Sequence, residues 1–144
     1  MDPRASNRIS DQKMIQSKLL SVCAKEAENL NIILPCDGAS NVGQVAHQAA
    51  VELTDSGVGR MCCVTAVGAE SKTHVDIMKR AKKITVINGC PNQCVKRILD
   101  KLNLHIDQNI VVSELGVAKL PTLDFKEEDV ERVSNKIRAY LSGV

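Results

Sequence analysis

Aromatic side chains are almost absent from this chain of 144 residues. It has no Trp, and its single Phe and single Tyr are Phe125 and Tyr140. Proteins that bind single-stranded nucleic acid stack bases on aromatic rings, so the platform for that function is missing. The net charge of +2 is also too small to indicate a nucleic-acid partner. The one basic run, residues 79–83, is better explained by cations that complement the C-terminal end of a helix.

Long apolar runs are absent as well. No segment contains the roughly 20 consecutive apolar residues that a membrane-spanning helix needs. The first eleven residues show neither the apolar stretch nor the cleavage pattern of a secretory signal, and Met1-Asp2 excludes N-myristoylation. We therefore expect a cytoplasmic protein with no membrane partner, in which thiols stay reduced. A protein partner and a homo-oligomer are left open by the sequence.

The composition is that of a single globular domain. Hydrophobic residues make up 44% of the chain and charged residues 25%, which suffices for a real core. We predict one α/β domain over residues 1–144, with a polar and frayed start at residues 1–11. No linker or second domain is indicated.

Short apolar segments alternate with segments of helical periodicity. Apolar, β-branched runs predict strands at 31–36, 59–64, 84–87 and 110–112. Periodic apolar positions predict helices at 11–29, between a cap at Ser40 or Asn41 and Gly57, at 72–82, after Pro91, and from Asp124 to Leu141. Residues 113–121 fit a loop or a short edge element. This alternation predicts a three-layer, mainly parallel sheet of at least four strands with helices on both faces, of Rossmann-like or flavodoxin-like type.

The stretch 84–94 combines a strand, a turn and a helix start. A buried strand is followed by the turn residues Asn88-Gly89, and Pro91 suits the first position of a helix. Cys90 would then be the N-cap and Cys94 would lie one turn into the helix. The partial positive charge at a helix N-terminus favours thiolates, so this stretch suits metal binding or sulfur chemistry.

Three of the six cysteines recur at one interval. The differences 63 − 36 and 90 − 63 are both 27, about the length of one strand–helix unit, so Cys36, Cys63 and Cys90 should each follow a successive strand. Parallel strands end at one edge of the sheet, where open α/β folds bind ligands. Cys94 adds a fourth thiol. Four such sulfurs suit tetrahedral zinc and would also suit an iron–sulfur cluster.

The other cysteines have simpler interpretations. Cys62 and Cys63 are neighbours, so in a strand they point to opposite faces. The 27-residue interval selects Cys63 for the site and leaves Cys62 for packing, although Cys62 could replace it. Cys23 lies on the apolar face of the helix predicted at 11–29 and is expected to pack in the core.

Enzymatic alternatives use the same residues. A redox or sulfur-transfer enzyme would use Cys36 or Cys90 as nucleophile and Cys94 as resolving thiol. A cysteine phosphatase is disfavoured because its anion loop needs an arginine, and residues 37–43 contain none. Of the three histidines only His74 is predicted near the sheet edge, whereas His47 is expected at the surface. Asp37 and Glu114 are turn or capping residues that could also support a site.

Four segments resemble the DGC-domain family. They are LPCDGASNVGQ at 34–44, GRMCC at 59–63, NGCPNQC at 88–94 and VSELG at 112–116, and the resemblance covers residues 31–117. That family is described as a zinc-binding domain with four chelating cysteines. The resemblance implies zinc as the cofactor and Cys36, Cys63, Cys90 and Cys94 as the metal ligands.

One departure from the family motif concerns the residue before Gly89. The family is named for Asp-Gly-Cys, whereas this chain has Asn88-Gly89-Cys90. A neutral amide replaces a carboxylate, so any acid–base or ligand-supporting role of that position does not carry over. The family has no settled reaction. We therefore expect metal binding with a role in metal handling, regulation or docking, and leave enzymatic activity undecided.

Overall fold

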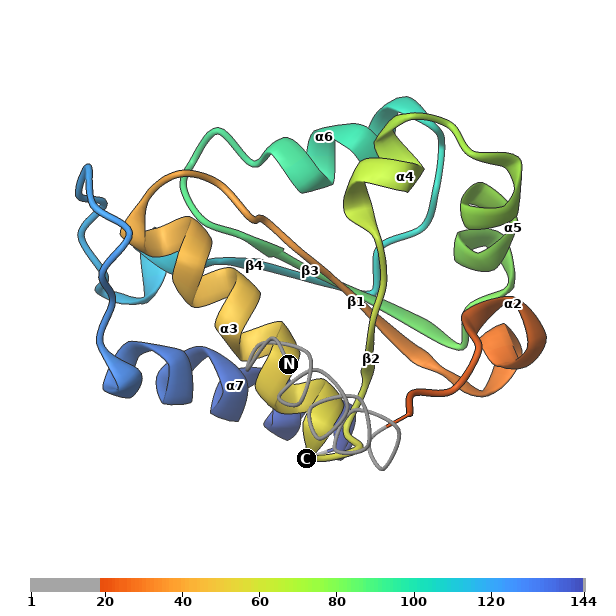
Figure 1. The fold of residues 1–144 in the computed structure, drawn as a ribbon, viewed down its shortest axis with the longest axis horizontal. Helices are drawn as coiled ribbons and strands as arrows, with labels where there is room; N and C mark the ends of the chain where they lie inside the picture. The colour runs from red at the N-terminus through yellow and green to blue at the C-terminus, as the bar shows by residue number, and fades with distance from the viewer. Residues whose placement is uncertain (1–18, 144) are drawn as a thin grey trace, which may run out of the picture.

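The sheet has four strands, all parallel. The computed structural model describes residues 19–143, so the predicted frayed segment 1–11 lies outside the described residues. Within them the strands are β1 (Asn31–Pro35), β2 (Arg60–Met61), β3 (Lys83–Asn88) and β4 (Gln108–Val111), in the order β2-β1-β3-β4 (Figure 1). The predicted parallel sheet is confirmed. The strand order reverses between β1 and β3, which is where open α/β sheets bind ligands.

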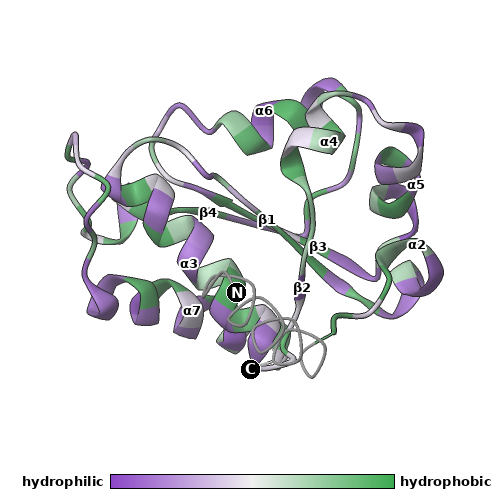
Figure 2. Cartoon of the chain, in the orientation of Figure 1, coloured by the Kyte–Doolittle hydropathy of each residue, from purple (hydrophilic) through white to green (hydrophobic). Residues whose placement is uncertain are grey.

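Two helical layers cover the sheet. Ile33 and Ile87 pack with the helices α3 (Asn41–Asp55) and α7 (Glu127–Leu141) on one face. Ile32, Leu34 and Val86 belong to the opposite face, with the helices α2 (Cys23–Glu26), α4 (Val64–Gly68), α5 (Lys72–Arg80) and α6 (Cys94–Lys101). Neighbouring apolar residues of β1 and β3 alternate between the two cores, whereas the helices carry both colours in Figure 2. The three-layer prediction holds.

Helix α3 begins and packs as its sequence predicts. Ser40 is its N-cap, and the Ser40 Oγ accepts a hydrogen bond of 3.3 Å from the backbone N–H of Gly43. All six residues of its predicted apolar face are buried: Val42, Val45, Ala46, Ala49, Ala50 and Leu53. None of the helices within residues 19–143 is both long enough and apolar enough to cross a bilayer.

The first predicted helix is much shorter in the described residues. Residues 19–22 are not helical, and α2 is followed by a 3-10 helix at Ala27–Asn29. Residues 11–18 of the prediction lie outside the described part. Of its apolar stripe, Cys23 and Ala27 are buried, whereas Leu19 and Val22 are exposed. A stripe stabilises a helix only where it is buried, which explains why the helix does not extend back through residues 19–22.

Three other boundaries differ from the prediction. The edge strand β2 pairs with β1 alone and ends at Met61, and residues 64–68, expected as strand end and loop, form α4. Helix α6 begins at Cys94, because Gln93 before it has the left-handed φ of 49°. Cys90 is therefore not its N-cap. Helix α7 begins at Glu127 with no side-chain cap, so the capping box predicted from Asp124 is wrong.

Close backbone contacts join three segments near the strand-order reversal. A Cβ on Gly43, in the first turn of α3, would lie 2.4 Å from the carbonyl oxygen of Gly38. A Cβ on Gly89, which follows β3, would lie 3.0 Å from the backbone nitrogen of Gly43. The loop after β1, the start of α3 and the end of β3 thus touch through their backbones, which only residues without side chains permit.

We predict that Gly43→Ala lowers the free energy of unfolding by about 1–3 kcal/mol, because the new methyl group meets backbone atoms that cannot move aside. The expected gain in helix propensity, about 1 kcal/mol, is too small to offset this. Urea unfolding followed by circular dichroism measures the change. Gly68→Ala is the matched control, since its Cβ would meet only the end of the Ile98 side chain at 3.3 Å. An equal loss in both variants would contradict the explanation.

Candidate thiol site

Cys36 directly follows β1 and extends its pairing with β3. Its backbone N–H donates to the carbonyl of Ile87 at 2.8 Å. The loop then turns back over the sulfur, because the Gly38 N–H donates to the Cys36 Sγ at 3.3 Å. Cys36 is half-buried and packs against both hydrophobic cores. Its thiol therefore lies at the sheet edge, between the two helical layers.

Cys90 lies on the neighbouring strand end, two residues after β3. It is half-buried, and Lys119 Nζ approaches its Sγ at 3.6 Å. Lys119 comes from the long loop before α7, which Asn41 fixes at the start of α3. The Asn41 side-chain amide donates to the Ala118 carbonyl at 2.8 Å, and the Leu120 N–H donates back to the Asn41 Oδ1 at 2.6 Å. These two bonds flank Lys119 and hold it close to the thiol.

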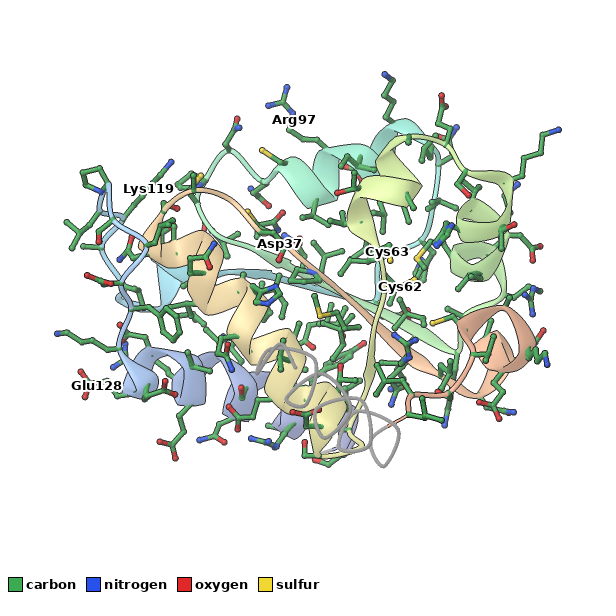
Figure 3. All side chains as sticks on the ribbon, viewed as in Figure 1. Asp37, Cys62, Cys63, Arg97, Lys119 and Glu128 are labelled. Carbon is green, nitrogen blue, oxygen red and sulfur yellow. The ribbon has the colours of Figure 1, made fainter. Side chains whose placement is uncertain are left out.

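Cys63 and Cys62 have opposite environments at the end of β2. Cys62 is 6% exposed and belongs to the core on the α4–α6 face, whereas Cys63 is exposed at the N-cap of α4. Burial, followed by the neighbouring Cys23 thiol, raises the pKa of Cys62 to about 11. The sequence-based assignment of Cys62 to packing agrees with its burial. Figure 3 shows the pair at the end of β2.

Cys94 is the first residue of α6 and is exposed. Its Sγ accepts a hydrogen bond of 3.0 Å from the Asn92 amide. Asn92 in turn accepts from Arg97 at 3.0 Å, so the amide is held from the following turn of the helix. The thiol lies at a helix N-terminus, as expected, although the helix starts three residues later than Pro91.

The four thiols share one edge of the sheet but do not form a coordination shell. Among residues 19–143, no group of three or more His, Cys, Asp or Glu side chains is placed to hold a metal ion. The donor types fit zinc, since four sulfurs are the usual ligands of a structural zinc site. The assignment of Cys36, Cys63, Cys90 and Cys94 as ligands therefore remains a prediction.

Asn88 is a structural residue at the end of β3. It is 1% exposed, and its amide nitrogen donates to the Asn109 Oδ1 at 2.7 Å and to the Ile110 carbonyl at 3.1 Å. Its Oδ1 accepts from the Lys96 N–H at 3.2 Å, within the first turn of α6. The side chain thereby joins β3 to both β4 and α6. An aspartate at this position could still accept the hydrogen bond from Lys96, but it could not donate the two bonds that Asn88 makes to Asn109 and Ile110.

The acidic and histidine candidates are placed differently from the thiols. Asp37 pairs with His47 through a contact of 2.7 Å between the Oδ1 and the Nδ1, so His47 rather than His74 lies beside the loop of Cys36. His74 contacts Ser71 instead, at 2.9 Å. Glu114 is exposed in a short 3-10 helix. The sequence pattern did not reveal α4, which lies between β2 and α5.

Lys119 and Asn92 are the site residues that sequence reasoning missed. Asn92 lies two residues before Cys94, but a short polar residue there also suits a turn. Lys119 is 29 residues from Cys90 in a segment without periodicity, so no sequence signal connects the two. Figure 3 shows Lys119 on the loop before α7, with Asp37 between it and Cys63 in that view.

The fold and the thiol-bearing edge define an α/β protein with cysteine thiols beyond the carboxyl ends of its parallel strands. The family model of the DGC domain matches residues 32–137, most of the chain. The chain therefore belongs to the DGC-domain family, as the sequence motifs predict.

A curated protein matches most of the chain. The chain is similar to the "Anaerobic and virulence modulator AnvM" of Pseudomonas aeruginosa strain PAO1, with 28% identity over 113 residues. The match covers 78% of this chain and 86% of that protein. No solved structure matches the chain.

We predict that, in protein stripped of metal with a chelator, iodoacetamide alkylates Cys63 at least about tenfold faster than Cys62 at pH 8, because thiolate is the reactive form. Cys63 is exposed, whereas Cys62 is buried and its pKa of about 11 leaves little thiolate at that pH. Fragmentation mass spectrometry of the peptide that contains both residues separates them. Protein unfolded in urea is the control and should show similar rates. Equal rates in the folded protein would exclude the different environments described here.

We also predict that Asn88→Asp lowers the free energy of unfolding by roughly 2 kcal/mol or more, although it restores the family motif. The carboxylate would be buried against two acceptors that have lost their donor. Asn103→Asp, at an exposed position, should change stability by no more than about 0.5 kcal/mol. Urea denaturation of both variants checks this, and a stable Asn88→Asp protein would show that the amide is not needed as a donor.

Proposed function

We propose that this chain is a metal-binding protein that holds one zinc ion through the thiolates of Cys36, Cys63, Cys90 and Cys94. The observation that carries the proposal is the set of donors around the sulfurs. Three of the four thiols each accept a hydrogen bond from a different nearby donor, namely the Gly38 N–H, the Lys119 ammonium and the Asn92 amide. Such donors support metal-bound thiolates, which carry negative charge and accept hydrogen bonds from surrounding groups.

The position of the thiols supports the same function. Cys36 and Cys90 follow the adjacent strands β1 and β3, between which the strand order reverses. Cys63 is the N-cap of α4 and Cys94 is the first residue of α6, so both thiols lie beyond the carboxyl ends of the strands that precede these helices. Zinc binds cysteines as thiolates, and all four thiols can reach solvent at least in part, so a metal ion can approach them.

Metal binding would have to bring the exposed thiols to the half-buried pair. Cys63 and Cys94 are both exposed, so their side chains can reorient without leaving a packed core. Four thiolates around a divalent ion leave an excess of two negative charges. Lys119, next to Cys90, would offset part of that excess.

The biological role we propose is regulatory. The Pseudomonas relative is named a modulator, which supports regulation over passive metal storage. A metal that gathers α4, α6 and the loop of Lys119 would change the surface at this edge, where a partner could dock. We propose the cytoplasm as its compartment, because reduced thiols are required.

A thiol enzyme is the second candidate, favoured by the contact between Lys119 and Cys90. An ammonium beside a half-exposed sulfur is typical of reactive cysteines, and Cys94 would be the resolving thiol. An iron–sulfur cluster on the same four residues is the alternative metal centre.

Elemental analysis of anaerobically purified protein, with a visible spectrum, tests the proposal. We expect about one zinc per chain in the wild type and a severalfold loss in Cys94→Ser, which replaces an exposed thiol by a hydroxyl and should leave the fold intact. Cys23→Ser is the matched control and should retain the zinc, since Cys23 is outside the proposed ligand set.

The other possible results would favour a different metal, an enzyme or a different set of ligands. Stoichiometric iron with a coloured spectrum would replace zinc by a cluster. The absence of any metal together with rapidly reacting thiols would favour the enzyme. Loss of zinc in Cys23→Ser but not in Cys94→Ser would refute the ligand set.

A further inference from the structure

A cavity of about 490 Å³ lies beside the edge strand β2. Its wall is mostly apolar and is formed by the segment before α2, the end of α3, β2 and the start of α4. The apolar side chains that line it include Leu20, Val51, Met61 and Val64. Both the volume and the apolar lining are typical of pockets that bind small organic molecules.

Hydrogen bonds hold the walls of this cavity in place. The Met61 N–H donates to the Thr54 Oγ1 at 2.9 Å, which joins β2 to the end of α3. On the other side, the Arg60 Nε donates to the Ser21 carbonyl at 3.1 Å and so keeps the neighbouring Leu20 beside β2. The cavity is therefore formed before any ligand enters, and binding does not have to order its walls.

One exposed thiol lines the cavity. Cys63, the N-cap of α4, is exposed and belongs to the lining. Cys62 also lines the cavity, but only 6% of its surface is exposed. Cys94, the other exposed thiol of the sheet edge, is not part of the lining. Cys63 thus combines access to solvent with an adjoining apolar wall, and a bound apolar molecule would be held next to its sulfur.

We propose that this cavity binds small apolar α,β-unsaturated carbonyl compounds and directs their addition to the thiol of Cys63. The sulfur reacts as the thiolate and forms a bond to the β-carbon, while the π electron pair of the C=C bond moves to give an enolate. The α-carbon then takes up one proton, which replaces the proton that the thiol released. Sulfur and hydrogen are added across the double bond, and no oxidant or reductant is required.

The cavity accelerates this addition by holding the compound near the sulfur, which raises its local concentration. The consequence for the metal site rests on the proposed function. An adduct on Cys63 removes one of the four thiolates proposed to bind zinc, so the compound would lower the zinc affinity of the chain. The addition itself needs no metal, so it can be tested separately from zinc binding.

Brief treatment of the full chain, stripped of metal with a chelator, tests the inference. One sample receives cyclohexenone and another receives acrylamide, because both add thiols at a C=C bond but only cyclohexenone has an apolar ring. Fragmentation mass spectrometry measures addition at Cys63 and at Cys94, and their ratio cancels the intrinsic reactivity of each reagent. We expect a ratio roughly tenfold higher with cyclohexenone, which requires burial of only about 60 Å² of its apolar surface.

Two neighbouring leucines provide a matched pair of variants. Leu20 lines the cavity and is 49% exposed, whereas Leu19 does not line it and is 78% exposed. Leu20→Asn should lower the preference of cyclohexenone for Cys63 severalfold, and Leu19→Asn should leave it unchanged. Circular dichroism of both variants confirms that they fold. Equal ratios for the two reagents in the wild type, or equal effects of the two substitutions, would overturn the proposal.

Zinc content, measured on untreated protein, separates this inference from the proposed function. A chain that binds no zinc but shows the preference at Cys63 would refute the zinc site and support the cavity. A chain that binds zinc but shows no preference would refute the cavity and leave the zinc site standing.

Discussion

Backbone contact among Gly38, Gly43 and Gly89 is the constraint on which the thiol-bearing edge depends. These glycines belong to the loop after β1, the first turn of α3 and the turn after β3. Gly43 leaves no room for a Cβ and Gly89 leaves very little, so the two strand ends that carry Cys36 and Cys90 are held against the same helix. The interaction is steric, and it fixes positions that a flexible loop would leave variable.

Two buried amide side chains also fix the segments that surround the thiols. Asn88 connects the end of β3 to β4 and to the first turn of α6. It therefore fixes the position of Cys90 relative to Cys94 across the turn that joins them. Asn41 connects the start of α3 to the loop that carries Lys119. Each is at least nine-tenths buried and uses both its donor and its acceptor, so neither leaves an unmet polar group in the core. These amides define the surroundings of the thiols.

Asn88, which replaces the aspartate of the family motif, has a structural role in this protein. In the motif the residue stands directly before Gly-Cys, which suggests a chemical role by proximity. In this fold its side chain turns into the protein, toward the strand β4 and the helix α6. The proposed metal chemistry therefore depends on the sulfurs and the donors around them rather than on this residue.

The sequence by itself determined the parallel α/β architecture, the apolar face of α3 and the placement of three cysteines after successive strands. These follow from local periodicity and from the length of a strand–helix unit, which residues near in sequence decide. Only the tertiary structure decided that Cys62 is buried in the same core as Cys23 and that α6 begins at Cys94. It also brought Lys119 to Cys90 and turned the Asn88 side chain inward. Such features depend on contacts between distant segments and on the shape left by packing, and no local pattern records them.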